Sequence, residues 1–388
     1  MSRFVQLHVL TSYPPSNLNR DDTGRPKTAL MGDALRLRIS SQSQKRAWRT
    51  SDTFASFLPE GQALLGTRTK RIGLEWIYPK LLEQGISDEE AKKWSMILQR
   101  TYGEPEKEDE NDEEKALLNG QLVHVSPVEQ ERLKALIVDL SKYLKDGASN
   151  EVAEKVVKAV AKRDKASDKK KGNATLAREL AELLLVQEAT AIDIALFGRM
   201  LASVPAFNFD AAIQVAHAIT VHKSAVEDDY FSAVDDLNSG LTDKGAAHIG
   251  ERSYGAGLFY LYICIDRALL VDNLGGDKTL ADKALQAFIH AVTKVSPTGM
   301  QNSHASRAYA SYVLAEKGDQ QPRSLAQAFL KPVKPFEGED MLEKAVKAIE
   351  TRRTNFDKVY GTCADARYAI NAETGEGSLD ELIRFTQE

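Results

Sequence analysis

The 388-residue chain contains only two cysteines, Cys264 and Cys363. So few thiols exclude a disulfide scaffold and a cysteine-based zinc site, and they are typical of a reducing compartment. No apolar run approaches the ~20 residues that a membrane-spanning helix needs. The apolar run at the amino terminus is also too short for a signal peptide. We therefore expect a cytoplasmic protein that does not enter a membrane.

The chain also lacks the common signatures of catalysis and of metal or nucleotide binding. It has no GxGxxG fingerprint, Walker A loop, HExxH pair or EF-hand loop. His217 and His222 lie five residues apart in a predicted strand, so they point to opposite faces and are poorly placed to share a metal. The adjacent Asp235 and Asp236 fit a cap or solvated acids better than a metal pair. We expect no catalytic residues, no metal and no cofactor.

The chain is acidic overall, but its amino terminus is basic. The formal net charge is −5, yet the first fifty residues hold nine Lys or Arg against three Asp. The centre of this basic segment is RLRISSQSQKRAWR, residues 36–49, which mixes cations with hydroxyl and amide side chains. Cations neutralise phosphates, and Ser and Gln donate hydrogen bonds to their oxygens. The segment therefore suits a sugar–phosphate backbone, although a solvated helix face would explain it equally well.

Hydrophobic periodicity predicts one strand and one helix in this amino-terminal region. Residues 3–12 alternate between apolar and polar, which is typical of a half-exposed strand. Residues 13–39 hold three prolines and polar clusters, so we expect a long irregular loop of functional importance. A helix should begin near Ser40 or Ser41, because Ser41 and Gln44 have capping-box spacing.

The middle of the chain, from about residue 60 to residue 195, is predicted to be helical. Helix starts are indicated at Ser87 and at Ser126, where a proline follows the capping serine. Further helices are expected over 151–163 and 174–196. Two charged runs interrupt this segment, with eight acids in 104–114 and six bases in 162–171. Both fit solvated loops better than functional tails, and the whole segment resembles a large helical insertion.

Strand patterns return after the insertion and define the fold class. Strands are predicted over 213–221, 256–266 and 306–316, and the polar stretch 222–254 suggests a protruding hairpin between the first two. Helices are predicted over 279–295, 340–358 and 378–386. Without the insertion the order is strand, helix, strand, strand, helix, strand, the ferredoxin-like unit of RNA-recognition modules. We therefore predict an α+β fold, although this fold alone does not establish RNA binding.

Several separate sequence blocks occur in the order found in one known family. They are HVL-x-S-x-PPSNLNRDD at 8–22, RLRISSQSQKRAWR at 36–49, DIALFGRM at 193–200, AIQVAHAITVH at 212–222, DDYFSAVDDL at 228–237, GAAHIG at 245–250 and GAGLFYLY at 255–262. On these blocks the chain resembles the CasC family, the repeated backbone subunits of type I-E CRISPR Cascade surveillance complexes. The family often has Lys where this chain has Gln44 or Arg49.

The resemblance implies a hand-shaped subunit with an RNA-recognition-like (RRM-like) palm, helical fingers and a hairpin thumb. The palm would comprise 1–58, a strand in 200–221 and, with the carboxy-terminal helices, 255–388. The fingers would be 59–199 and the thumb 222–254. Copies of such subunits stack head to tail along one CRISPR RNA, and the guide RNA reads target DNA by base pairing. Other Cascade subunits (large, small and end-capping) would be partners, and a recruited nuclease-helicase would act separately.

The resemblance also assigns RNA-binding roles to residues that match the family's motifs. Phosphates and sugars of the guide would be held by polar side chains, and a displaced nucleotide would be wedged by apolar ones. The implied RNA-binding residues are Arg20, Lys27, Ser40, Gln42, Lys45, Arg46, Arg49, Arg199, Met200, Tyr230 and Phe231.

Two alternatives to a non-catalytic RNA scaffold remain open at this point. One is a guide-processing ribonuclease on the same fold, in which His8 or His217 would be the general base and Lys45 would lie near the scissile phosphate. The other is a binder of protein partners, in which the charged runs 104–114 and 162–171 would be the docking segments.

Overall fold

The computed structural model describes residues 2–107, 112–147, 149–233, 248–334 and 338–388. The chain divides into two compact units. The first consists of Met1–Pro59, Ile213–Ala268 and Ala281–Glu388, and the second of Glu60–Ala212 and Leu269–Leu280. The tip of the predicted thumb, 234–247, with Asp235 and Asp236, lies outside the described residues, as do 108–111 of the acidic run.

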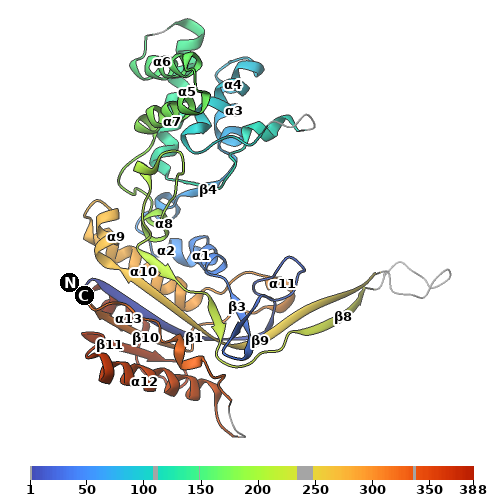
Figure 1. Cartoon of the computed structure of the whole chain (residues 1–388), viewed down its shortest axis with the longest axis vertical. Helices are drawn as coiled ribbons and strands as arrows, with labels where there is room; N and C mark the ends of the chain where they lie inside the picture. The colour runs from blue at the N-terminus through green and yellow to red at the C-terminus, as the bar shows by residue number, and fades with distance from the viewer. Residues whose placement is uncertain (1, 108–111, 148, 234–247, 335–337) are drawn as a thin grey trace, which may run out of the picture. The chain divides into compact units, whose positions relative to one another are not determined.

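The first unit is built on a large antiparallel sheet (Figure 1). The strands follow the order β11-β10-β1-β9-β7-β3-β2, and β6 and β8 also pair with β9. Their bounds are β1 Phe4–Ser16, β2 Thr28–Met31, β3 Ala34–Ile39, β6 Ile213–Val215, β7 Ala218–Thr220, β8 Glu227–Ala233, β9 His248–Asp266, β10 Tyr312–Gly318 and β11 Ala366–Asn371. The mixture of helices with an antiparallel sheet fits the predicted α+β class.

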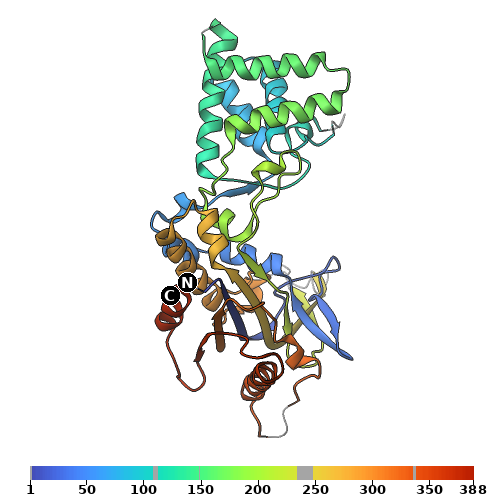
Figure 2. The same cartoon turned by 60° about the vertical axis from the view of Figure 1, so that its left-hand side comes forward.

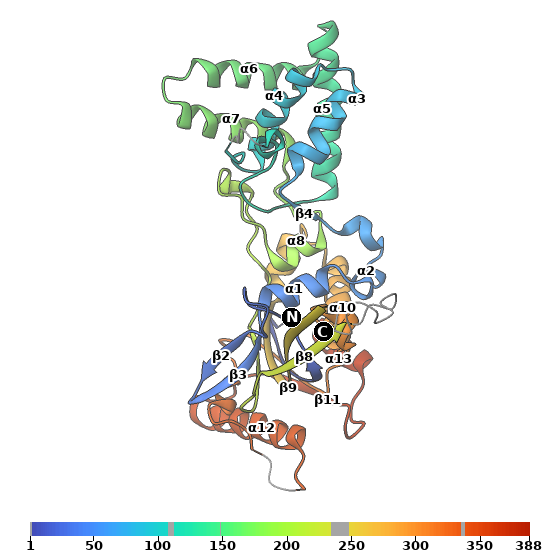
Figure 3. The same cartoon turned by 90° about the vertical axis from the view of Figure 1, so that its right-hand side faces the viewer.

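Helices cover both faces of this sheet because side chains alternate along each strand. On one face, Trp48 of α1 packs edge-on against Phe288 of α10, with ring centroids 5.5 Å apart. On the other face, Ala345 and Ile349 of α12 join a buried cluster with Leu10 of β1 (Figures 1 and 3). The helices of these layers are α1 Ser41–Arg49, α2 Asp52–Ser56, α10 Lys278–Lys294, α11 Gln301–His304, α12 Met341–Tyr360 and α13 Leu379–Gln387.

The second unit is mainly helical, and α5, α6 and α7 lie side by side within it (Figure 2). Its helices are α3 Tyr78–Glu83, α4 Asp88–Leu98, α5 Pro127–Asp146, α6 Glu151–Lys165, α7 Lys169–Leu184 and α8 Ile192–Phe197, and α9 Arg267–Asn273 follows β9. The strands β4 Thr67–Thr69 and β5 Val123–Val125 pair with each other. The predicted capping box at α5 is present, with Ser126 and Glu129 bonding reciprocally. Helices α3 to α7 and strand β5 contribute to one apolar core.

The predicted irregular loop over 13–39 is wrong in part, because β1 continues to Ser16 and β2 and β3 form a hairpin. The hairpin turns at Gly32, whose φ of 55° favours glycine. The apolar pattern of this hairpin does not predict which side chains are buried, because Arg36 is fully buried and Leu30 is 77% exposed. The two terminal nitrogens of the Arg36 guanidinium donate hydrogen bonds to the carbonyl oxygens of Thr220 and Phe329, which partly offsets the cost of burying this cation.

Two other predicted elements are interrupted in the structure. The helix expected over 174–196 ends at Leu184, because the next residues bond elsewhere: Val186 N–H donates to Glu129 and Ala189 N–H to the carbonyl of Asn273. The strand expected over 213–221 is divided into β6 and β7. Its register against β9 shifts by one residue between the two pieces, as in a β-bulge.

Candidate nucleic-acid interface

The basic segment forms α1, and Ser40 rather than Ser41 caps it. The Ser40 hydroxyl oxygen accepts a hydrogen bond from the Ser43 N–H at 3.2 Å. The Ser40 N–H donates to the side chain of Asn19 at 2.9 Å, which ties the helix start to the preceding loop. Ser40 is only 8% exposed. Its role in the structure is therefore to begin and position α1, whereas the sequence suggested a direct contact with RNA.

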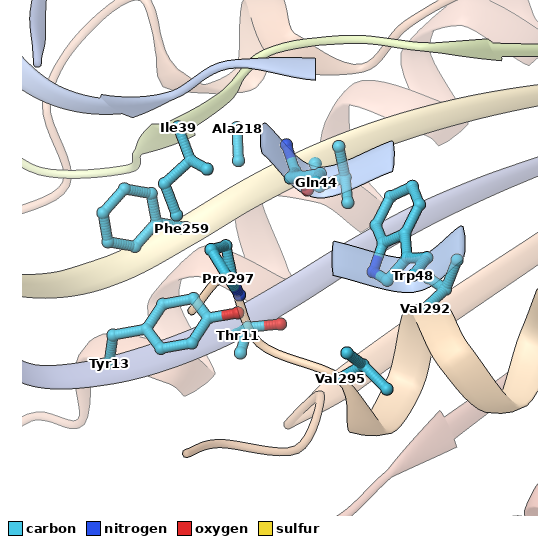
Figure 4. A pocket seen from close by; sticks show the side chains of 11 residues that line it. Thr11, Tyr13, Ile39, Gln44, Trp48, Ala218, Phe259, Val292, Val295 and Pro297 are labelled. Atoms are coloured by element: carbon cyan, nitrogen blue, oxygen red, sulfur yellow. The ribbon is translucent and has the colours of Figure 1, made fainter. Parts of the chain in front are cut away.

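The inner face of α1 is fixed against the sheet. Gln44 and Trp48 point into a small cavity of about 20 Å³, enough for roughly one water molecule (Figure 4). Gln44 is 5% exposed, and its side-chain nitrogen has no hydrogen-bond partner in the described protein. Gln44 therefore cannot contact a ligand at the surface. The family often has Lys at this position, but because the side chain points inward here, the change to Gln removes no cation from the outer face of α1.

The outer face of α1 carries the polar residues that the sequence singled out. Gln42 and Arg46 are exposed, one helical turn apart, while Lys45 and Arg49 are partly exposed. No acidic residue occupies the first turn of α1. The positive end of the helix dipole is therefore not neutralised by the helix's own side chains, and it adds to the positive potential of this face.

The loop between β1 and β2 is held in shape by Asp21. The Asp21 carboxylate accepts hydrogen bonds from the Thr23 hydroxyl and from the N–H groups of Thr23 and Arg25. The hydrogen bond from Thr23, supported by these backbone donors, lowers the pKa of Asp21. Asn19 and Lys27 close the loop through a backbone hydrogen bond of 2.8 Å. The charge of Asp21 is thus used to order the loop that presents Arg20.

An open groove of about 550 Å³ lies between this loop and α1. It brings Arg20 of the loop beside Arg46 of the helix, together with the hydroxyl-bearing Ser43, Thr50 and Thr298. We call it the α1 groove. Its remaining lining residues are Leu18, Asn19, Asp21, Asp22, Gly24, Ala47 and Gly299. The cations and hydroxyl groups of the groove match the chemistry of a sugar–phosphate backbone.

Lys27 lies beside Arg38, a basic residue that is not among the predicted RNA-binding residues. Arg38 of β3 approaches His217, with its guanidinium nitrogen 2.8 Å from the imidazole Nδ1. Partial burial, followed by the charges of Arg38 and Lys27, lowers the pKa of His217. Lys27 and Arg38 also line one small pocket next to β3. Arg36 and Arg38 are two residues apart in a strand, so their side chains share one face. Only Arg36 is fully buried.

Arg199 does not lie on a binding surface. Its side chain is 1% exposed, and its guanidinium is 2.7 Å from the carboxylate of the fully buried Glu129. It also donates to the carbonyl oxygens of Phe207 and His124. Its donors are therefore occupied inside the second unit. This is a correction to the predicted interface, because a cation that holds a buried carboxylate has no surface to offer a phosphate.

The two thumb aromatics point to opposite faces of the β8–β9 ribbon. Tyr230 pairs with Glu251 and the next residue, Phe231, pairs with Gly250, so their side chains alternate. Tyr230 is 68% exposed. The guanidinium of Arg252 lies over the Phe231 ring, 4.8 Å from its centroid. Only Tyr230 therefore presents a largely uncovered ring.

The remaining predicted residues differ in exposure. Met200 belongs to the second unit and is 73% exposed, which suits an apolar contact with a partner. His8 is fully buried, with its Nε2 3.1 Å from the Glu316 carboxylate and its Nδ1 2.8 Å from the Tyr260 hydroxyl. A general base must reach its substrate, so this position rules out His8 in the ribonuclease alternative.

The described residues hold neither a cluster suited to a metal ion nor a helix suited to span a membrane. No group of three or more His, Cys, Asp or Glu side chains in these ranges could hold a metal ion. None of the helices described is both long and apolar enough to cross a membrane.

Comparison with known proteins assigns the chain to a family. A chain of a solved structure described as "CRISPR RNA-guided surveillance complex, pre-nicking" has 28% sequence identity and a TM-score of 0.77, with 99% of each chain covered. A chain of a second, "CRISPR RNA-guided surveillance complex", has 23% identity and a TM-score of 0.56 over 99% of each chain, which shows a common fold. No curated protein matches. The CT1975-like proteins match over residues 5–385, and the chain belongs to this family.

Proposed function

We propose that this protein is a non-catalytic, guide-RNA-binding backbone subunit of a CRISPR surveillance complex. The similarity to chains of RNA-guided surveillance complexes supports this function at the level of the complex. The observation that carries it to particular residues is the α1 groove, which joins Arg20 and Arg46 with three hydroxyl side chains. Lys27 and Arg38 add two basic side chains next to β3.

The sheet supports the proposal that the first unit is a ferredoxin-like, RRM-like palm. Its central order β10-β1-β9-β7 is antiparallel, and α1 follows β1 in the chain while α10 follows β9. In this proposal the second unit is the fingers, and the β8–β9 ribbon is the base of the thumb. The sheet then serves as a rigid support for the α1 groove.

The more specific proposal is a type I-E CasC subunit. Copies of the chain would stack head to tail along one CRISPR RNA in the cytoplasm, and the bound guide would pair with target DNA. The large, small and end-capping subunits would complete the complex, and a separately recruited nuclease-helicase would cut the target. The exposed Met200 and Tyr230 are apolar groups suited to contact a displaced nucleotide.

The test of the RNA-binding function is a charge-neutralised α1 groove. We expect Arg20→Ala with Arg46→Ala to weaken guide-RNA binding and to lower the salt slope by about 1.4, since each phosphate contact on a single strand contributes about 0.7. Fluorescence anisotropy with a labelled guide RNA, at about 50 to about 200 mM NaCl, measures both quantities.

The matched control is Lys134→Ala with Lys142→Ala. It removes the same charge from two exposed positions of α5. We expect its salt slope to equal that of the wild type. The same affinity and slope in the groove variant as in the wild type would exclude the α1 groove as the RNA-binding surface.

A further inference from the structure

A second groove lies on the face of the sheet that α12 covers, opposite the face that carries α1 (Figure 3). Its volume is about 430 Å³, and one wall is α12 while the other is the segment 328–334. The lining residues are Ala328, Val333, Lys334, Lys344, Lys347, Ala348, Thr351, Arg352 and Asn355. We call it the α12 groove.

The α12 groove has positive charge without lining carboxylates. Lys334, Lys344, Lys347 and Arg352 are cations, and every other lining residue is neutral. Lys344 pairs with Glu339, and Arg352 lies over the Phe356 ring. Within the described ranges, no ion pair joins Lys334, Lys347 or Arg352 to a carboxylate. An anion in this groove would therefore meet several cations at once.

A groove in the second unit shows the contrasting arrangement. Between α6 and α7, the lysines Lys155, Lys158 and Lys162 each form an ion pair, with Glu151, Glu154 and Glu179 respectively. The acidic Glu179 and Glu182 also line that groove. The lysines that line this groove are thus paired with carboxylates, whereas the α12 groove has four lining cations and no lining carboxylate.

The lining residues of α12 form one continuous face. Positions 344, 347, 348, 351, 352 and 355 recur at the three- and four-residue spacing of a helical stripe. From Lys344 to Asn355 the stripe is about 16 Å long, at about 1.5 Å per residue. That length accommodates several phosphates of one strand. Thr351 and Asn355 add hydroxyl and amide groups that can bond to phosphate oxygens.

Hydrogen bonds to the sheet region fix the segment 328–334, which forms the wall of the groove opposite α12. The buried guanidinium of Arg36 donates to the Phe329 carbonyl at 2.7 Å and to the Thr220 carbonyl at 2.9 Å. The Val333 N–H donates to the Val221 carbonyl at 2.9 Å. These bonds attach the segment 328–334 to the sheet. The groove therefore exists before a ligand binds, and little conformational entropy is lost when its wall residues contact the ligand.

We propose that the α12 groove binds the sugar–phosphate backbone of a nucleic-acid strand at a site separate from the α1 groove. Its apolar residues are small (Ala328, Val333 and Ala348), so it offers little to the large anchor side chains that dominate protein interfaces. The cations, hydroxyl and amide instead suit phosphate. The proposal goes beyond guide binding, because the two grooves lie on opposite faces of the sheet.

The test is the triple substitution Lys334→Ala, Lys347→Ala and Arg352→Ala, with Lys344 retained because it pairs with Glu339. The probe is fluorescein-labelled oligo(dT), added to the purified protein with its co-purified RNA retained. We expect roughly tenfold weaker binding near 0.1 M NaCl, and a salt slope lower by about 2, from three contacts at about 0.7 each.

The control variant is Lys80→Ala, Lys134→Ala and Lys155→Ala, which removes the same charge from three lysines already paired with carboxylates. We expect this control to bind oligo(dT) as the wild type does. Both variants should retain the same amount of co-purified RNA. Full retention of that RNA in Arg20→Ala, Arg46→Ala would instead count against the α1 groove as the guide-binding surface, and it would leave the oligo(dT) result for the α12 groove unaffected.

Two results would overturn the proposal. One is a triple variant with the affinity and salt slope of the wild type. The other is tighter wild-type binding to labelled poly-glutamate than to oligo(dT), lost in the triple variant, which would assign the groove to an acidic protein segment. Equal thermal unfolding of wild type and triple variant establishes that a loss of binding is not a loss of folding.

Discussion

Arg199 and Glu129 form a buried ion pair, with 2.7 Å between guanidinium nitrogen and carboxylate oxygen. The same carboxylate accepts hydrogen bonds from the N–H groups of Ser126, at the start of α5, and Val186, just after α7. One side chain therefore joins two helix ends to the segment that carries Arg199. The pair explains why a residue that the sequence placed at the RNA is found in the interior.

We predict that Arg199→Ala destabilises the second unit by about 3–5 kcal/mol, because it leaves the Glu129 carboxylate buried without a cation. Urea unfolding measures this loss, with Trp76 and Trp94 as fluorescent reporters in that unit. The Arg199→Ala, Glu129→Gln double variant should recover part of the stability, since no uncompensated charge remains. The RNA salt slope of folded Arg199→Ala should equal that of the wild type. A lower slope would show that Arg199 contacts RNA.

The opposite orientations of Tyr230 and Phe231 lead to a second prediction. Tyr230→Ala should abolish the periodic reactivity of nucleotides along the bound guide, because the exposed ring is the one that can stack on a base. Chemical probing of the RNA in the assembled complex measures this pattern. Phe231→Ala should leave the pattern in place and act on the ribbon, since its ring lies under Arg252. Loss of the pattern in Phe231→Ala together with its retention in Tyr230→Ala would contradict the ribbon geometry.

Local sequence patterns were sufficient for the elements with strong start signals. The capping box at Ser126 predicted α5, and the Ser41–Gln44 spacing predicted the start of α1 to within one residue, because capping acts within a few residues. The capping residue of α1 is Ser40, so the predicted Ser41–Gln44 pair is wrong. The same patterns predicted the strand within β9 from its continuous apolar run. They also placed Arg46 in a helix next to a functional loop, which is where the α1 groove lies.

The failures share a different cause, which is burial of polar groups by distant parts of the chain. The buried Arg36 donates to the carbonyl oxygens of Thr220 and Phe329, and the buried Arg199 pairs with Glu129. None of these partners is near in sequence, so the sequence showed neither the burial of Arg36 within the basic segment nor that of Arg199, to which the family resemblance gave an RNA-binding role. The burial of Gln44 could not be predicted for a related reason, since only the packing of α1 on the sheet shows which side of the helix is covered.

The buried polar cluster around His8 leads to a prediction about pH. Burial lowers the pKa of His8, which keeps the imidazole neutral in the folded protein. Burial alone would raise the pKa of Glu316, but the hydrogen bonds from His8, Arg323 and Arg367 hold it well below its usual range. Below about pH 6.5 the unfolded chain binds a proton at His8 that the folded chain does not. The free energy of unfolding should therefore fall as the pH drops below that value.

We expect His8 to contribute up to about 1.4 kcal/mol per pH unit to this fall. His8→Gln keeps a donor for Glu316 and an acceptor for Tyr260 but does not titrate. The difference in unfolding free energy between wild type and His8→Gln should therefore shrink from pH 7 to pH 5. Other histidines titrate equally in both proteins and cancel in this difference. A constant difference across that range would show that folding does not lower the pKa of His8, and a growing difference would show that folding raises it.

The close packing of Gly299 under the loop leads to the last prediction. A Cβ on Gly299 would collide with the carbonyl of Leu18 and lie 2.8 Å from that of Asn17, and both atoms belong to the backbone. Gly299→Ala must therefore move the loop that presents Arg20, at a cost of about 1–3 kcal/mol. We expect weaker guide-RNA binding by anisotropy with an unchanged salt slope, because the cations remain. Thr298→Ala, the neighbouring substitution in the same groove, removes a hydroxyl without moving the loop and should bind more tightly than Gly299→Ala. Wild-type affinity in Gly299→Ala would mean that the position of this loop does not control RNA binding.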